Sequence, residues 1–310
     1  MKKEIKDIPA SVHARLKNLA EQSGRTFQEL FYYYAMERFL YRLSSSQYSN
    51  NFVLKGGLMF KGWGIPLRRP TRDIDVQGYE KNSIENLITI VQNICAQEVE
   101  SDGMQFDPDS VRGEKIISEA EYQGIRIYFV GYLGKASIHL HLDVSFANVI
   151  SPKEIEVKYP CLLNMPSFEI RGYPYETTIS EKFESMVKLG DANDRMKDFF
   201  DIWVLSQHVE IQGASLAKAI RATFKNRKTP LPTNMPIALT SEFAMHRQKD
   251  WERFLRRSGL NVQEYPPFNE VIVVLREFIW PVVLAVANNE TFKNTWNAAG
   301  SWISPKNNLH

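Results

Sequence analysis

The chain has 310 residues, a formal net charge of +2 and a hydrophobic content of 44%. These values are typical of a globular protein with a sizeable core, and the length favours two lobes rather than one. Because the net charge is nearly balanced, overall composition gives no indication of nucleic-acid binding, and the local distribution of charge is the more informative property.

Compartment signals are few. Cys95 and Cys161 lie in apolar surroundings without metal-ligand spacing, which predicts free thiols in a reducing compartment. The charged residues 1–7 are not followed by an apolar segment, so we expect no signal peptide. The most apolar run, residues 278–287, is interrupted by Pro281 and is too short to span a bilayer. We therefore expect a cytoplasmic protein with no membrane partner.

Two helices are predicted near the N-terminus. Ser11 is placed to cap the first, and Thr26–Glu29 forms a capping box that opens the second, which continues toward Leu43. The run Tyr32–Tyr34 in the second helix has two interpretations, base stacking or packing. Its helical spacing favours packing in the core and at its rim.

A glycine turn and a pair of carboxylates follow. The apolar run Phe52–Leu54 ends at Gly56 and Gly57, where two glycines let backbone N–H groups approach an anion closely. Asp73 and Asp75 then alternate with apolar residues, so they share one face of a predicted strand, about 7 Å apart. Carboxylates at that spacing can share two magnesium ions separated by about 4 Å. The order of strand, glycine turn, short helix, basic loop and acidic strand is typical of the metal and triphosphate site of a nucleotidyltransferase.

Two basic residues flank this stretch. Lys55 precedes the glycine turn and Arg72 precedes the first aspartate, and both are candidates for holding phosphate oxygens. Arg72 has an equally good second use, which is a structural ion pair with Asp75.

The middle of the chain predicts a helix over residues 83–95, a polar loop over about 100–110, and strands from Val111 onward. The strands cover residues 115–118, 125–130 and 137–145, and the last two form a hairpin through residues 132–135. A further strand is expected over Phe168–Gly172.

Asp143 shares one face of the 137–145 strand with His139 and His141. The strand either turns these polar side chains to water, or places Asp143 beside Asp73 and Asp75 as a third metal carboxylate. A carboxylate cluster requires a cation, because like charges at that range cannot all ionise without one. We do not interpret the histidines as zinc ligands, since no cysteine or third histidine accompanies them.

A lysine and an acidic stripe follow in the predicted helices downstream. Thr178–Glu181 forms a capping box, which places Lys182 in the first turn of a helix, where a cation is unfavourable. This hints at a nearby ligand anion, although a partner carboxylate such as Asp198 explains it equally well. In the helix over residues 194–205, Arg195, Asp198 and Asp201 recur at a spacing of three and line one stripe, which fits either surface ion pairs or catalysis.

The last third is helical and basic. Residues 211–260 contain ten basic and three acidic side chains, which makes this segment the best candidate for a phosphate-backbone surface. Residues 268–287 predict a long apolar helix that is kinked or stopped at Pro281. The polar tail after residue 288 gives no indication of its role.

With these elements placed, the chain resembles the AbiEii/AbiGii-type nucleotidyltransferase toxins of bacterial type IV toxin–antitoxin and phage-defence systems, in the DNA polymerase β-like superfamily. The pairing of Lys-Gly-Gly with Arg-Pro-Thr-Arg-Asp-Ile-Asp is the most specific part. The resemblance extends from near the N-terminus to about residue 205 and is carried by six motifs: Ser11–Leu16, Glu37–Leu43, Phe52–Gly57, Arg69–Asp75, Ser180–Lys182 and Arg195–Asp201.

This resemblance implies an α+β fold of two lobes, a small mixed sheet with helices over residues 1–165 and a mostly helical lobe over residues 166–310. It implies Mg²⁺ at Asp73 and Asp75 and an NTP as substrate, and our hypothesis from the strand pattern adds Asp143 as a further metal ligand. Lys182 would neutralise phosphate charge and Asp198 would complete the catalytic set. The implied substrate contacts are Lys55, Gly56, Gly57, Arg72 and Arg195.

The activity implied is transfer of a nucleoside monophosphate to an acceptor hydroxyl, with the 3′ end of tRNA as the acceptor and a cognate antitoxin as a partner. Such transfer would inhibit translation and growth. One departure from the superfamily pattern is Gly57, which stands where the turn usually carries serine and so lacks one phosphate-binding hydroxyl. Three alternatives remain open: a protein or small-molecule acceptor, phosphotransfer by the same fold, and a non-catalytic binding module.

Overall fold

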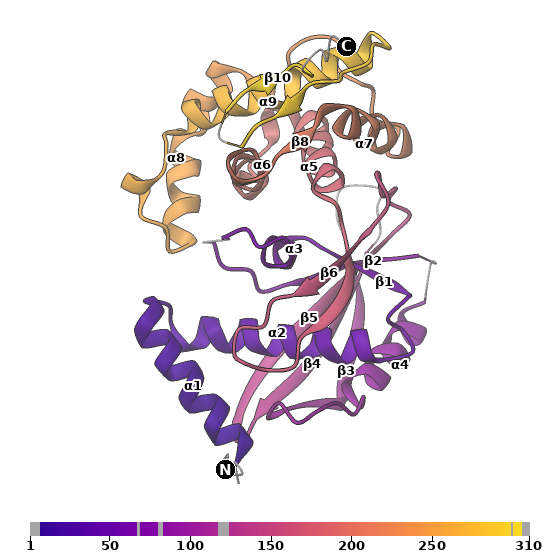
Figure 1. The fold of residues 1–310 in the computed structure, drawn as a ribbon, viewed down its shortest axis with the longest axis vertical. Helices are drawn as coiled ribbons and strands as arrows, with labels where there is room; N and C mark the ends of the chain where they lie inside the picture. The colour runs from indigo at the N-terminus through magenta and orange to yellow at the C-terminus, as the bar shows by residue number, and fades with distance from the viewer. Residues whose placement is uncertain (1–6, 67–68, 80–82, 117–123, 299, 306–310) are drawn as a thin grey trace, which may run out of the picture. The chain divides into compact units, whose positions relative to one another are not determined.

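The computed structural model describes residues 7–66, 69–79, 83–116, 124–298 and 300–305 (Figure 1). The chain forms two compact units. The first comprises Met1–Ala147 and Ile155–Gly172, and the second comprises Asn148–Glu154 and Tyr173–His310. The chain therefore leaves the first unit once and returns to it before continuing into the second.

The first unit is built on a seven-stranded sheet with the strand order β3-β4-β5-β2-β1-β7-β6. The sheet is mixed, because β2 and β5 run parallel, as do β1 and β7, whereas the other neighbours are antiparallel. Its elements are α1 (Ile8–Ser23), α2 (Phe27–Ser45), β1 (Phe52–Lys55), α3 (Gly57–Gly62), β2 (Ile74–Gly78), α4 (Ile84–Cys95), β3 (Met104–Ile116), β4 (Gly124–Leu133), β5 (Ala136–Phe146), β6 (Ile155–Tyr159) and β7 (Phe168–Gly172).

One face of this sheet is apolar and fully buried. Helix α2 lies across the strands and contacts β3, β5 and β7, and α4 contacts β3 and β4 (Figure 1). Ile74 and Val76 of β2 and Val144 of β5 have no exposed surface in this core. Because side chains alternate along a strand, the residues between them are directed to the opposite face.

The N-terminal helices differ from the prediction at one cap. Helix α1 begins at Ile8, where the Asp7 carboxylate accepts a hydrogen bond of 2.9 Å from the Ala10 N–H, so the expectation that Ser11 caps this helix is wrong. The proline at position 9 favours the earlier start, since the first turn requires no N–H from it. The predicted cap at Thr26 is confirmed by its hydrogen bond with the Glu29 N–H.

The middle strands also correct one expectation. The predicted loop over about 100–110 is largely strand, because β3 begins at Met104 and buries both Met104 and Phe106. A bulge between Asp107 and Arg112 interrupts its alternation, which is why the segment looks irregular in sequence. The β4–β5 hairpin is confirmed, and the predicted strand over 115–118 lies partly outside the described residues.

The second unit is mostly helical. Helix α9 continues through Pro281, so the proline does not stop it. Trp296, in the polar tail, is buried within a small sheet of order β10-β9-β8. No helix in the described ranges is long and apolar enough to cross a membrane. The elements are α5 (Tyr175–Leu189), η1 (Gly190–Ala192), α6 (Met196–His208), β8 (Ile211–Gln212), α7 (Gly213–Asn226), η2 (Ile237–Leu239), α8 (Ser241–Arg257), η3 (Val262–Glu264), α9 (Phe268–Ala287), β9 (Thr295–Trp296) and β10 (Trp302–Ile303).

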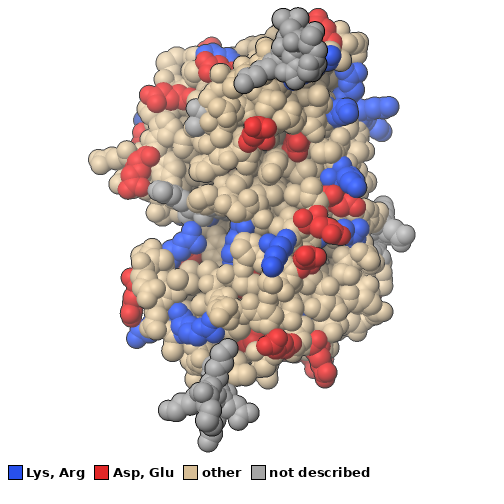
Figure 2. Space-filling view, viewed as in Figure 1, with Lys and Arg blue, Asp and Glu red and all other residues tan. Residues whose placement is uncertain are grey.

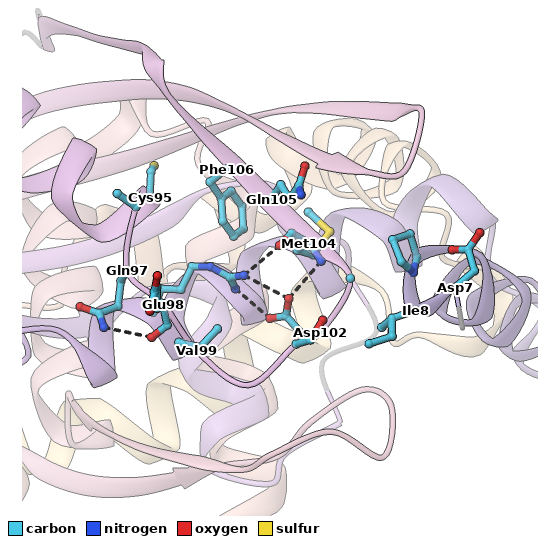
Figure 3. Close-up of a pocket in the computed structure, with 15 residues that line it drawn as sticks. Asp7, Ile8, Cys95, Gln97, Glu98, Val99, Asp102, Met104, Gln105 and Phe106 are labelled. Carbon is cyan, nitrogen blue, oxygen red and sulfur yellow. Dashed lines mark hydrogen bonds and ion pairs between the residues drawn. The ribbon is translucent and has the colours of Figure 1, made fainter. Parts of the chain in front are cut away.

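A buried ion pair joins α2 to the start of β3. The Arg42 guanidinium donates two hydrogen bonds to Asp102, of 2.7 and 3.1 Å, and a third to the Met104 carbonyl. Asp102 also accepts the Met104 N–H, as Figure 3 shows beside the pocket that these residues line. With both side chains buried, this pair sets the position of β3 relative to α2.

We expect Asp102→Ala to lower the free energy of unfolding of the first unit by about 3–5 kcal/mol, because the guanidinium would stay buried without its partner. The matched control is Glu252→Ala on α8, which removes the half-buried partner of the exposed Arg256 and should leave stability nearly unchanged. Urea titration followed by circular dichroism measures both variants. Equal effects of the two would contradict a structural role for the buried pair.

Candidate active site

The glycine turn lies directly against β2. Gly56 adopts φ +69° and ψ −151°, a conformation that favours glycine, and a Cβ at this position would overlap the Asp75 carboxylate. Helix α3 begins at the next residue, Gly57. The local sequence therefore folds as predicted, into a short buried strand, the glycine turn and a short helix. Residue 56 has to be glycine because the Asp75 carboxylate occupies the space of a side chain there.

The two aspartates lie at the start of β2. Asp73 immediately precedes the strand and Asp75 is its second residue, between the fully buried Ile74 and Val76. The Asp73 carboxylate remains 42% exposed and lies 2.8 Å from Nε2 of His141 on β5. His141 thus belongs to this polar face and was not assigned a role from the sequence, where only its alternation with Asp143 was visible.

A row of charged residues crosses the polar face of the sheet. The register pairs Lys55 of β1 with Asp75, Asp75 with Asp143 of β5, and Asp143 with Arg126 of β4. Residues paired in register direct their side chains to the same face of the sheet. The four strands therefore present a row in which two carboxylates lie between two cationic side chains. The predicted adjacency of Asp143 and Asp75 is present in the structure.

Asp143 is already engaged by an arginine. Nε and Nη2 of Arg126 each donate a 2.7 Å hydrogen bond to the two carboxylate oxygens, in a bidentate pair. The hydrogen bonding to Asp143 raises the pKa of Arg126 above its usual value. Sequence reasoning missed Arg126, because its alternation with Ile125 and Ile127 shows a polar face but not the strand it pairs with.

The donor chemistry of the two β2 aspartates fits a divalent cation, since magnesium prefers hard carboxylate oxygens. The third carboxylate is shared with an arginine, because each Asp143 oxygen accepts a hydrogen bond from the Arg126 guanidinium and only the remaining lone pairs could bind a cation. Across the described ranges, no three His, Cys, Asp or Glu side chains are grouped so that they could hold a metal ion.

Arg72 contacts an aromatic ring of α2. Its guanidinium carbon lies 5.9 Å from the centroid of the half-buried Tyr32 ring, a cation–π distance. The neighbouring Tyr33 and Tyr34 are buried, which excludes base stacking on those two rings and agrees with the packing interpretation.

In the second unit, the helix that carries Lys182 starts earlier than predicted. Helix α5 begins at Tyr175 after Pro174, so Lys182 lies in the third turn and the argument from an unfavourable first-turn cation is wrong. Thr178, the expected cap, is buried within this helix and does not precede it. The X-Pro sequence, which ends the preceding extended segment, marks the true boundary.

Lys182 lies in an ionic cluster with two buried carboxylates from α6. Its Nζ is 2.6 Å from Asp198 and 2.8 Å from Asp201, and both aspartate side chains are at most 2% exposed. Arg195 lies 2.9 Å from the second oxygen of Asp198 and is 46% exposed. The predicted stripe of Arg195, Asp198 and Asp201 therefore faces Lys182, and the carboxylate partner proposed for this lysine is present.

Comparison with known proteins finds a match to one family model. The model of the nucleotidyl transferase AbiEii toxin of type IV toxin–antitoxin systems matches residues 38–274. Among solved structures, the chain is similar to JHP933 from Helicobacter pylori, at 14% identity over 85% of this chain and 95% of that chain, with a TM-score of 0.49. It is also similar to a structure described as "putative nucleotidyltransferase from H. pylori", at 14% identity over 86% and 100% of the chains, with a TM-score of 0.48. No curated protein matches the sequence.

The family match covers the glycine turn, the β2 aspartates, Asp143, and the Lys182 cluster. It starts after the first motif of the resemblance, at Ser11–Leu16, and continues well beyond residue 205, into the basic helices of the second unit. The family inferred from the sequence motifs is thereby confirmed. The chain belongs to the AbiEii nucleotidyltransferase toxin family of type IV toxin–antitoxin systems.

Proposed function

We propose that this nucleotidyltransferase transfers a nucleoside monophosphate from an NTP to the 3′-terminal hydroxyl of tRNA, and that translation and growth are thereby inhibited until a cognate antitoxin counters the enzyme. The observation that carries the proposal is the polar row of Lys55, Asp75 and Asp143 beside the Gly56 turn, because it combines hard oxygen donors with a closely approachable backbone. The cytoplasm, which contains both NTPs and tRNA, is the compartment this activity requires.

The reaction is an in-line displacement. The acceptor oxygen attacks the α-phosphorus, a new P–O bond forms, the bond to the β-phosphate bridging oxygen breaks, and pyrophosphate leaves while the hydroxyl proton passes to solvent. Asp73 and Asp75 would hold the divalent cation. When bound, that cation lowers the pKa of the acceptor hydroxyl and stabilises the charge that develops on the phosphate.

The remaining residues bind and orient. Lys55 and Arg72 flank the carboxylates and would contact phosphate oxygens, with the backbone of Gly56 and Gly57 lining the same turn. Lys182 would neutralise phosphate charge, and Asp198 would hold the lysine and Arg195 in position for the NTP. Lys182 and Arg195 both pair with Asp198 in the structure, so phosphate binding at these two residues would exchange one ion pair for another.

The acceptor assignment rests on the basic segment 211–260. Four of its ten basic residues lie in ion pairs: Arg227 pairs with Glu181 and Glu184, Arg247 and Arg253 share Asp250, and Arg256 pairs with Glu252. On the face shown in Figure 2, acidic and basic side chains are interspersed. The other six basic residues therefore carry most of the argument for an RNA acceptor: Lys218, Arg221, Lys225, Lys228, Lys249 and Arg257.

The proposal is tested by a labelled-NTP survey. The protein is incubated with each NTP, labelled in turn at the α- and γ-phosphate, and with separate pools of tRNA, protein and small metabolites. We expect α-label in tRNA only. Transfer of γ-label would indicate a phosphotransferase, and α-label in protein or metabolites would replace the acceptor. Absence of label in every pool would contradict an enzymatic role.

Asp73→Asn and Asp75→Asn should each reduce α-label incorporation by about 100-fold or more, because each removes a charged donor that acts in the transition state. The matched control is Asp109→Asn, an exposed aspartate on β3 of the same sheet, which should keep wild-type activity. Incorporation should also be lost in EDTA and restored by Mg²⁺. Near-wild-type rates in both site variants would remove the carboxylates from the mechanism.

Lys182→Met should lower the free energy of unfolding of the second unit by about 3–5 kcal/mol, because two buried carboxylates lose their shared cation. The control Arg195→Met should change stability little, since this arginine is half exposed and Lys182 still pairs with Asp198. Urea titration measures both. If Lys182→Met kept full stability and lost NTP incorporation, the lysine would serve the ligand alone rather than the fold as well.

A further inference from the structure

The space that a side chain of Gly57 would occupy in the glycine turn is taken by Thr71. A Cβ built on Gly57 would lie 2.6 Å from the Thr71 hydroxyl oxygen and 2.9 Å from the Thr71 Cβ, closer than real Cβ contacts allow. Gly57 does not have a positive φ, so its backbone conformation would accept a larger residue. The obstacle to a side chain at residue 57 is therefore Thr71 itself.

Thr71 is held firmly in this place. It is 8% exposed, and its backbone N–H donates a 3.1 Å hydrogen bond to the hydroxyl oxygen of Tyr33 on α2. The same tyrosine hydroxyl donates to the Arg69 carbonyl at 3.4 Å. Burial raises the pKa of Tyr33 above its usual value, so the phenol stays protonated and able to donate. Tyr33 thus bridges the two ends of the Arg69–Thr71 segment.

The Thr71 hydroxyl itself makes no hydrogen bond to any residue that the structure describes. A hydroxyl can donate one hydrogen bond and accept others, so this group has the capacity to bind a ligand oxygen. Next to it along the turn, Gly56 packs against the Asp75 carboxylate, and consecutive Cα atoms lie about 3.8 Å apart. One two-residue turn thus contacts the metal-site carboxylate at Gly56 and an unused hydroxyl at Gly57.

We infer that Thr71 supplies the phosphate-binding hydroxyl of this nucleotide site, and that Gly57 is glycine because the hydroxyl reaches the turn from the Arg69–Asp73 segment. Tyr33 is the positioning residue for this contact. The inference rests on the proposed function and deepens it, since it names a residue that binds the NTP triphosphate. A serine hydroxyl at residue 57 and the Thr71 hydroxyl would bind the same phosphate oxygen. The two arrangements would therefore provide the same hydrogen bond from different segments of the chain.

The first test separates the hydroxyl from the shape of Thr71. Thr71→Val keeps the branched shape and removes the donor, so the KM for NTP should rise about 10- to 100-fold, the loss expected for a hydrogen bond to a charged group. Thr71→Ser keeps the hydroxyl and should retain a KM near that of the wild type. Equilibrium binding of a non-hydrolysable NTP analogue should follow the same order.

The second test moves the hydroxyl across the turn. Gly57→Ser alone should impair NTP binding, because its Cβ overlaps Thr71. Thr71→Gly alone removes the hydroxyl and the obstructing atoms. The double variant Gly57→Ser/Thr71→Gly should recover NTP affinity relative to Thr71→Gly, because the hydroxyl returns from the other segment. A double variant that binds no better than Thr71→Gly would contradict the exchange.

The role of Tyr33 is tested by coupling. Tyr33→Phe should raise the KM for NTP with little change in kcat in the wild-type background, and should add no further effect in the Thr71→Val background. A merely structural tyrosine would give additive effects.

Two failures are distinguishable. A wild-type protein that neither binds nor incorporates any NTP would remove the proposed function together with this inference. An active wild type whose KM is unchanged by Thr71→Val would overturn the inference alone and leave the reaction assignment in place.

Discussion

The first unit depends on placing two carboxylates side by side in the middle of a sheet. Asp75 and Asp143 are register partners on β2 and β5, where two negative charges repel each other unless cations lie close by. The sheet supplies one cation on each side, Lys55 from β1 and Arg126 from β4. The opposite face of the same strands is fully buried, so register is strongly fixed and the charged row cannot slip by one residue.

The second unit also places two carboxylates close together beside a cation, here on helices. Asp198 and Asp201 project from one stripe of α6, almost without exposure, and Lys182 of α5 lies within ion-pair distance of both. Buried pairs of this kind contribute little net stability but are costly to break, because the remaining charge stays desolvated. Both units therefore present charges that are already paired within the protein.

The sequence predicted the local elements of the site well and its long-range pairing in part, since the adjacency of Asp75 and Asp143 was expected and the pair of Asp143 with Arg126 was not. The turn at Gly56, the β2 aspartates and the β4–β5 hairpin follow from glycine chemistry and alternation, which are local signals. The contact between Asp143 and Arg126 depends on which strands become neighbours, and alternation carries no such information. The start of α5 was misplaced because Thr178–Glu181 satisfies the capping-box pattern, although Pro174 sets the boundary. The bulge in β3 likewise hid a strand inside an apparently irregular stretch.

The charge balance of the row of charged residues across β1, β2, β5 and β4 limits how many cations the protein alone can hold. Asp73, Asp75 and Asp143 contribute three negative charges, and Lys55 and Arg126 already offset two of them. One divalent cation on the β2 aspartates would turn a net negative site positive, which suits a triphosphate. A second cation held by Asp143 would share that carboxylate with the Arg126 guanidinium and would raise the net charge of the row further. A second cation is therefore expected to arrive with the triphosphate, whose added negative charge offsets it, rather than before the NTP.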